Sequence, residues 1–298
     1  MKKFIFLVAG ILMAVMAYAQ DLGNYRLNIG QFDKVKIYDN VNVVYRCLPD
    51  SSGYVQFQGT EEFENAFIFN LKKDGTLKIQ VNTEDIGKPD LPVLYIYSDF
   101  LISAENSSDF SLSIENPAPC AEFSATQVGN GSIDVENIKA NKVIASITTG
   151  SGTVTLSGAC VSASFRMVGA GLISADRLKA DEVSCRILGT GSIGCWPLEK
   201  LQVRGIGTTK IYYKGNPQIK KSGGGKLFEL PEESEEEYYA APIGREVREV
   251  IVEEEISDEE VDIDDNDDEG DDDEGDEEDD DDDDDDDVEP TVVTEEDD

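Results

Sequence analysis

The stretch Gly129-Asn130-Gly131-Ser132-Ile133 begins a series of glycine pairs that recurs about every twenty residues. In each copy the two glycines enclose one residue, and a run of β-forming residues follows. The next copies are Gly150-Ser151-Gly152-Thr153-Val154, Gly169-Ala170-Gly171-Leu172-Ile173 and Gly189-Thr190-Gly191-Ser192-Ile193. Two weaker copies end the series, Gly207-Thr208-Thr209-Lys210-Ile211 and Gly223-Gly224-Gly225-Lys226-Leu227.

A drifting period of this size is typical of a solenoid, in which each repeat is one coil that buries its core face only against its neighbours. We therefore predict an all-β protein, a parallel β-helix with coils of about 20 residues. Glycine suits the corner of a coil because it adopts positive φ freely and lets successive coils approach closely. The predicted structural corner glycines are Gly129, Gly131, Gly150, Gly152, Gly169, Gly171, Gly189, Gly191, Gly207, Gly223 and Gly225.

Apolar residues alternate along the strands on both sides of a glycine pair. Before the fourth pair they are Val183, Cys185 and Ile187, and after it they are Ile193 and Cys195. Coils stacked about 4.8 Å apart align equivalent side chains in columns. We therefore expect these residues to point into the core of the helix.

The cysteines have no regular spacing. An exported chain permits disulfides, but an odd number of cysteines leaves at least one thiol free. Neighbouring coils carry Phe165 and Val203 at the position of Cys185, so we interpret that cysteine, and Cys195 with it, as a small buried apolar residue. The pairing stays open among Cys47, Cys120, Cys160, Cys185 and Cys195.

The domain that we predict covers residues 20–231. Within it, residues 20–106 are expected to form short strands, and residues 107–231 the glycine-bearing coils. Asp74-Gly75 is a dipeptide that favours a hairpin turn. Because unpaired strand edges need covering, we expect the N-terminal strands to cap one end of the helix and residues 220–230 the other. The strands expected in the first part are 33–38, 41–47, 54–58, 66–70, 76–81 and 92–98.

The first residues carry the features of an export signal. Lys2-Lys3 is followed by an apolar stretch over residues 4–16 and by the cleavage pattern Ala17-Tyr18-Ala19. The apolar stretch falls short of the roughly 18 residues that a membrane helix needs. We therefore predict a signal peptide over residues 1–19, no transmembrane segment, and a mature protein in the periplasm or at the cell surface.

Acidic residues are concentrated at the C-terminal end. From Glu232 onward there are 40 Asp and Glu against two basic residues, whereas the preceding residues carry 23 of each sign, so the net charge of −38 belongs to this tail. Such a segment buries little apolar surface and repels itself, which predicts disorder over residues 232–298. Asp265 to Asp276 imitates an EF-hand loop without its helices, so we expect no cofactor beyond loose binding of divalent cations. Solubility and capture of basic partners are further roles for the tail.

The sequence argues against several kinds of chemistry. The chain has no histidine, which excludes Ser-His-Asp and Cys-His nucleophilic sites. The match to G-x-G-x-x-G at residues 189–194 precedes β-forming residues rather than the helix that a dinucleotide site needs. Neutral charge before the tail argues against nucleic acid as a partner. We predict no catalytic, cofactor-binding or metal-binding residues, since the carboxylates do not recur at matched coil positions: Asp85, Asp90, Asp134, Asp176 and Asp181.

Three features together resemble a known family. They are the strand Phe32-Asp33-Lys34-Val35-Lys36-Ile37, the repeated corners, and the closing Ile211-Tyr212-Tyr213-Lys214-Gly215-Asn216-Pro217 with its glycine run. The chain resembles the head GIN domain family of auto-transporter adhesins over residues 30–230, and Thr209 departs from the pattern at one corner. The resemblance implies an exported Bacteroidetes protein with a right-handed β-helix, similar in shape to pectin-lyase-like proteins but without their catalytic residues.

Taken together, these features favour a non-enzymatic β-helix that acts in surface adhesion or binds a glycan or an envelope component. One alternative is a polysaccharide lyase or glycosidase that uses carboxylates on the same fold. Another is a structural envelope protein whose acidic tail binds cations or basic partners. Self-association into a homo-oligomer, the identity of the ligand and the choice between periplasm and outer surface stay open.

Overall fold

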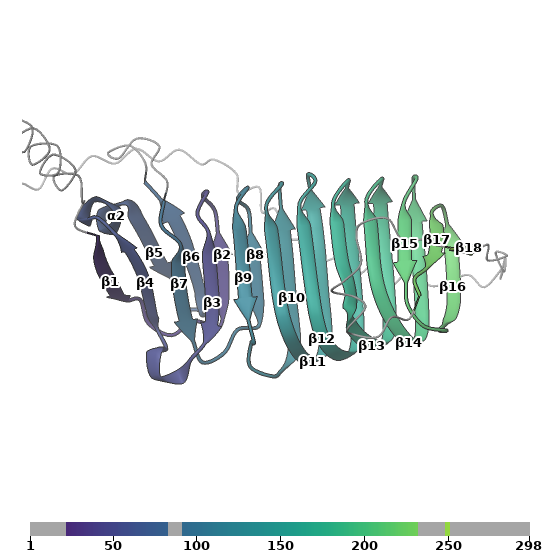
Figure 1. Ribbon diagram of the computed structural model, residues 1–298, viewed down its shortest axis with the longest axis horizontal. Coiled ribbons are helices and arrows are strands. Elements are labelled where there is room, and N and C mark those ends of the chain that lie inside the picture. The colour runs from purple at the N-terminus through teal and green to yellow at the C-terminus, as the bar shows by residue number, and fades with distance from the viewer. Residues whose placement is uncertain (1–21, 83–90, 232–247, 251–298) are drawn as a thin grey trace, which may run out of the picture. The chain divides into compact units, whose positions relative to one another are not determined.

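The computed structural model describes residues 22–82, 91–231 and 248–250. The predicted export signal and most of the predicted acidic tail lie outside these residues. The described residues belong to one compact unit, Met1–Glu254, and form a β-solenoid of about six turns (Figure 1). The prediction of an all-β helix of stacked parallel coils is confirmed.

Strands make up nearly all of the described fold. The two short helices are η1 (Pro49–Ser51) and α2 (Glu61–Ala66). The strands are β1 (Gly23–Asn28), β2 (Lys34–Ile37), β3 (Val43–Cys47), β4 (Tyr54–Gly59), β5 (Phe67–Leu71), β6 (Thr76–Val81), β7 (Leu94–Ser98), β8 (Ser103–Asn106), β9 (Ser111–Glu115), β10 (Cys120–Val128), β11 (Ser132–Thr149), β12 (Thr153–Gly169), β13 (Leu172–Gly189), β14 (Ser192–Ile206), β15 (Lys210–Tyr213), β16 (Gln218–Gly223), β17 (Lys226–Glu229) and β18 (Arg248–Val250).

The glycine corners join long strands that pair in parallel with the strands of the next coil. The core columns follow the register expected from the sequence. Cys185 pairs in register with Phe165 on one side and Val203 on the other, and all three side chains are buried. Cys195 lies in the column of Ala175 and is also buried. Both cysteines therefore pack as core residues, and all five thiols are free.

A second corner lies between β9 and β10 and within β11 and β12, where the chain bends without a glycine pair. Asn116 and Asn137 adopt positive φ there, 49° and 59°, and Gly158 has φ of 128°. Asparagine tolerates this region because its short side chain bonds locally. Asn137 Nδ2 donates to Asn116 Oδ1 over 2.7 Å, so the side chains also tie neighbouring coils together.

The order of coils in the stack differs from their order in the chain. Strands β2 and β3 pair in parallel with β6 and β7 on one side and with β8 and β9 on the other. The coil that contains residues 34–47 is therefore inserted between two coils that follow it in sequence (Figure 1). The parallel stack thus begins well before the first glycine pair.

Antiparallel strands lie at the N-terminal end of the stack, as expected. The predicted hairpin at Asp74-Gly75 joins β5 and β6, and β4 pairs antiparallel with both β1 and β7. The other end differs from expectation. Strands β16 and β17, which span residues 218–229 and so overlap the range 220–230, continue the parallel stack as its last coil, and β18 pairs antiparallel with β17. Strand β18 lies inside the range 232–298, in a short Val- and Ile-containing stretch that interrupts the acidic residues.

Candidate functional site

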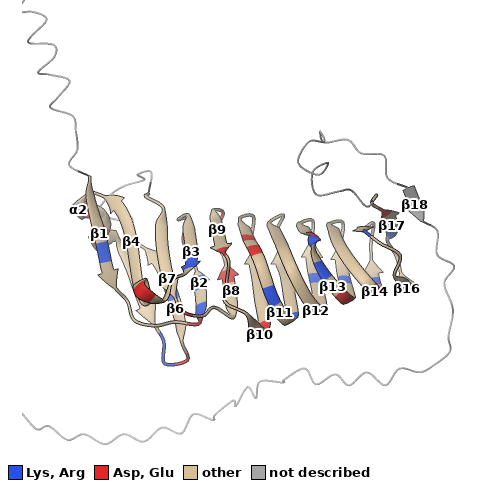
Figure 2. Cartoon of the chain, turned by 60° about the horizontal axis from the view of Figure 1, so that its bottom comes forward, with Lys and Arg blue, Asp and Glu red and all other residues tan. Residues whose placement is uncertain are grey.

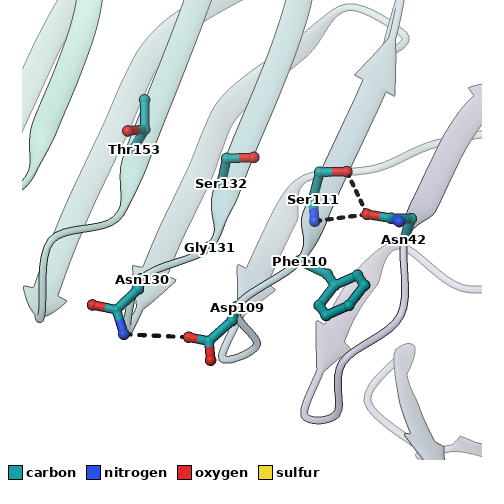
Figure 3. A pocket seen from close by; sticks show the side chains of 8 residues that line it. All are labelled: Asn42, Asp109, Phe110, Ser111, Asn130, Gly131, Ser132 and Thr153. Atoms are coloured by element: carbon teal, nitrogen blue, oxygen red, sulfur yellow. Dashed lines mark hydrogen bonds between the residues drawn. The ribbon is translucent and has the colours of Figure 1, made fainter. Parts of the chain in front are cut away.

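A recess of about 340 Å³ opens at the glycine corner of the coils near the middle of the stack (Figure 3). Its lining is polar apart from one aromatic ring and comes from four successive coils. The lining residues are Asn42, Asp109, Phe110, Ser111, Asn130, Gly131, Ser132 and Thr153.

The recess follows from the alignment of corner residues in columns. The residue between the two glycines of one corner lies next to its equivalents, so Asp109, Asn130 and Ser151 stand side by side. Asn130 Nδ2 donates to Asp109 Oδ1 over 3.3 Å, and the Ser151 hydroxyl donates to Asn130 Oδ1 over 3.1 Å. The Asp109 amide in turn donates to Asn40 Oδ1 over 3.0 Å.

A second polar column runs beside the first. It consists of the residues that start the strand after each corner, with Ser111 in register with Ser132 and Ser132 in register with Thr153. Asn42 extends it across the inserted coil, because its Oδ1 accepts hydrogen bonds from the Ser111 amide at 3.1 Å and from the Ser111 hydroxyl at 2.8 Å (Figure 3).

Gly131 and Phe110 line the recess at equivalent positions of neighbouring coils. Gly131 requires the absence of a side chain, since a Cβ atom at this position would collide with the carbonyl oxygens of Ser108 and Phe110. Phe110 occupies the position equivalent to Gly131 in a coil that has no glycine pair. Its side chain is 42% exposed, so an aromatic ring stands beside the polar columns.

The buried side chain of Asn106 stabilises this corner in place of glycine. Asn106 Nδ2 donates to the carbonyl oxygens of Phe110 at 2.8 Å and Ser132 at 3.1 Å. Its Oδ1 accepts from the Ser108 amide at 3.1 Å and the Ser108 hydroxyl at 2.8 Å. These four bonds hold the backbone that carries Phe110, so the orientation of the ring depends on a residue outside the recess.

The recess offers neutral hydrogen-bonding groups, one carboxylate and one exposed ring. Amide and hydroxyl side chains donate and accept, and an aromatic side chain presents a broad apolar face. Ligand sites commonly combine a few fixed polar groups with such an apolar surface. The set is suited to a polar, uncharged ligand with an apolar face, such as a sugar ring. Asp109 is the one carboxylate in the lining, so the lining holds no pair of acids for glycoside hydrolysis.

The predicted corner glycines lie at the corners in two geometries. One group adopts φ between +80° and +137°: Gly129, Gly150, Gly169, Gly189, Gly207, Gly223 and Gly225. The other group packs against backbone of a neighbouring coil: Gly131, Gly152, Gly171 and Gly191. The G-x-G-x-x-G match at residues 189–194 leads directly into strand β14 and not into a helix.

The carboxylates weighed for catalysis are dispersed. Asp85 and Asp90 lie outside the described residues. Burial raises the pKa of Asp134, whose side chain belongs to a column facing outward. Asp176 Oδ2 lies 3.6 Å from Lys214 Nζ, and both side chains are largely buried. The pKa of the Cys160 thiol is raised mainly by burial and in part by the negative charge of Asp181. In the part of the chain that the structure describes, no three His, Cys, Asp or Glu side chains gather as metal ligands would.

Sequence reasoning did not identify the recess. A partial signal was present, because Asp109, Asn130 and Ser151 are each separated by 21 residues and carry polar side chains at the exposed tip of the corner. Asn42 gave no such signal. It lies 69 residues from its partner Ser111, and only the inserted coil brings the two together.

The stacked coils define a β-solenoid with a polar recess at one corner. A scan against protein-family models matches residues 31–217 to the family described as "Putative auto-transporter adhesin, head GIN domain", and the chain belongs to this family. The resemblance seen in the sequence is thereby confirmed.

Solved structures share the fold. A putative adhesin from Bacteroides fragilis is 24% identical with a TM-score of 0.63, and the match covers 71% of this chain and 98% of that one. A putative adhesin from Parabacteroides merdae and a putative lipid binding protein from Parabacteroides distasonis are each 19% identical with TM-scores of 0.55, covering 72% of this chain and 98% of theirs. No curated protein matches the chain. The family and two of these neighbours are described as adhesins and not as enzymes. Within the described residues, no helix has the length and apolar character to cross a bilayer.

Proposed function

We propose that this protein is an exported, non-enzymatic adhesin that binds a glycan of a cell surface or envelope at the recess beside Phe110. The observation that supports it best is the combination of two polar columns with one exposed ring at a single corner. Membership of an adhesin family supports the class of function. The predicted signal peptide supports a location in the periplasm or at the cell surface.

The rigidity of the recess supports binding with little reorganisation. Asn42, Asp109 and Asn130 are already held by hydrogen bonds to neighbouring coils. Groups fixed before binding lose little conformational freedom when a ligand arrives, which favours affinity for small polar ligands. The stack also repeats polar positions at about the spacing of adjacent strands, 4.8 Å, so a linear glycan can contact several coils.

The test is a glycan array probed with the full mature chain and two variants. Phe110→Ala removes the ring from the recess, and Phe100→Ala removes a ring of similar exposure, 39%, that does not line it. The proposal predicts saturable binding of at least one glycan by the wild type and by Phe100→Ala. Phe110→Ala should weaken this binding at least about tenfold, which corresponds to roughly 1.4 kcal/mol. Release of cleaved or unsaturated products from the array would instead establish the enzyme alternative.

A further inference from the structure

A column of three arginines lies on the outer face of the coils, away from the recess residues. Arg166 pairs in register with Arg186, and Arg186 with Arg204, on strands β12, β13 and β14. All three side chains are exposed, because they alternate with the buried positions of the core. Figure 2 colours the basic positions of the coils blue and the acidic positions red. Parallel neighbours are about 4.8 Å apart, so three guanidinium groups repeat at that interval.

The column departs from the charge pattern elsewhere in the stack. At four other places registered neighbours of opposite charge form ion pairs: Lys36 with Glu105, Arg46 with Glu115, Glu122 with Lys142, and Glu182 with Lys200. The pair Lys36–Glu105 belongs to the same outer column as the three arginines. Like charges placed directly opposite one another are destabilising. None of the three arginines forms an ion pair among the described residues.

The columns on either side of the arginines restrict the chemistry of a partner. On one side lie Ser164, Ser184 and Gln202, and on the other Val168, Leu188 and Ile206. Leu188 and Ile206 are 52% and 71% exposed. The outer face of β12, β13 and β14 therefore carries three parallel strips, a polar strip of serines and glutamine, a cationic strip of arginines and an apolar strip of valine, leucine and isoleucine. A polymer of sugar acids presents hydroxyls, regularly repeated carboxylates and apolar ring faces, which match the three strips.

We propose that Arg166, Arg186 and Arg204 form a binding site for a linear acidic polysaccharide that lies along the stack. Each guanidinium donates charge-assisted hydrogen bonds to one carboxylate, for which its fixed fork of N–H groups is suited. The net charge of −38 comes from residues 232–298, and at physiological salt the repulsion between exposed charges more than about 8 Å apart is largely screened. The site is separate from the recess and does not depend on the proposed function.

The experiment measures binding of the full mature chain to polygalacturonate at several salt concentrations. Methyl-esterified polygalacturonate is the matched ligand, because it has the same sugar without the charge. Arg186→Gln removes the central cation, and the triple change to Gln at all three positions removes the site. Lys73→Gln is the control, since it makes the same charge change at an exposed position beside the β5–β6 turn.

The proposal predicts that wild type and Lys73→Gln bind the acidic polymer and not its ester. Arg186→Gln should bind at least about fivefold more weakly, with the slope of log K against log salt reduced by about one, as counterion release from a polyanion predicts. The triple variant should not bind. Equal binding by all variants, equal binding of the ester, or no binding by the wild type would each overturn the proposal. Binding to phosphatidylglycerol vesicles without binding to the polymer would overturn it in favour of a lipid surface. Phe110→Ala should bind the acidic polymer as the wild type does, because Phe110 lies in the recess and not among the arginines. A failure of the recess proposal and a failure of the arginine proposal can therefore be told apart.

Discussion

Substitution of two corner glycines separates the effect of backbone conformation from the effect of coil spacing. Gly129 and Gly150 have similar φ angles, +95° and +80°, in successive corners. A Cβ atom at Gly129 would have no heavy atom within 4 Å. A Cβ atom at Gly150 would lie 2.5 Å from the carbonyl oxygen of Gly129 and 2.8 Å from its carbonyl carbon. The two positions therefore differ mainly in the closeness of the neighbouring coil.

Gly129→Ala should lower the free energy of unfolding by about 1–2 kcal/mol, the cost of a left-handed conformation for a residue with Cβ. Gly150→Ala should carry the same cost and about 1–3 kcal/mol more, because the coils must separate locally to admit the methyl group. Urea unfolding followed by the fluorescence of Trp196, the single tryptophan, measures both variants against wild type. Equal destabilisation by the two variants would refute the argument that close coil contact requires glycine at Gly150.

Three further predictions concern buried polar groups. Asn106→Ala should lower the free energy of unfolding by about 2–4 kcal/mol, because it removes four hydrogen bonds, two of them to the buried Ser108. Amide hydrogen exchange at Ser108 should accelerate, and an unchanged rate would contradict this. Lys214→Met should lower the free energy of unfolding by about 3–5 kcal/mol, because it leaves the buried Asp176 carboxylate without this cation. Adding Asp176→Asn should restore part of the lost stability in urea unfolding, and the absence of any recovery would argue against an ion pair. Burial raises the pKa of the Cys160 thiol to about 12. The alkylation rate of this thiol in the folded chain should therefore keep rising with pH well beyond the ordinary thiol pKa of about 8.5, whereas the rate in concentrated urea should level off near pH 8.5. Identical pH profiles of alkylation, measured by mass spectrometry, would contradict the burial.

The repeated corners and the alternation of apolar residues were sufficient to predict the coils. Gly150 and its equivalents mark a position where the backbone geometry restricts the choice of residue, so the constraint is visible in the sequence. The register of Cys185 with Phe165 and Val203 followed from counting between corners. The second corner was not predicted, because Asn116 and Asn137 are single asparagines without a repeated motif around them, and glycine, Gly158, takes their place in the next coil.

The position of the first coil could not be predicted from period or composition. Strands β2 and β3 lack a glycine pair, and they enter the stack between coils that come later in the chain. Insertion of this kind depends on long-range strand pairing and leaves no local pattern. The site at the recess depends on it, since Asn42 reaches Ser111 only in this arrangement. The column of three arginines could not be predicted from the sequence either, because only the register between neighbouring coils shows which outward-facing residues become adjacent.

The most direct test of the central claim is hydrogen exchange of the full mature chain, measured with and without the glycan that binds best on the array. The account predicts slower exchange at the segments that line the recess, residues 106–111 and 129–132, together with residues 40–43 from the inserted coil. Because residues 40–43 are distant in sequence from the other two segments, joint protection of all three would locate the ligand at the recess. Protection confined to other coils, or no protection at saturating glycan, would contradict the claim that this corner is the binding site.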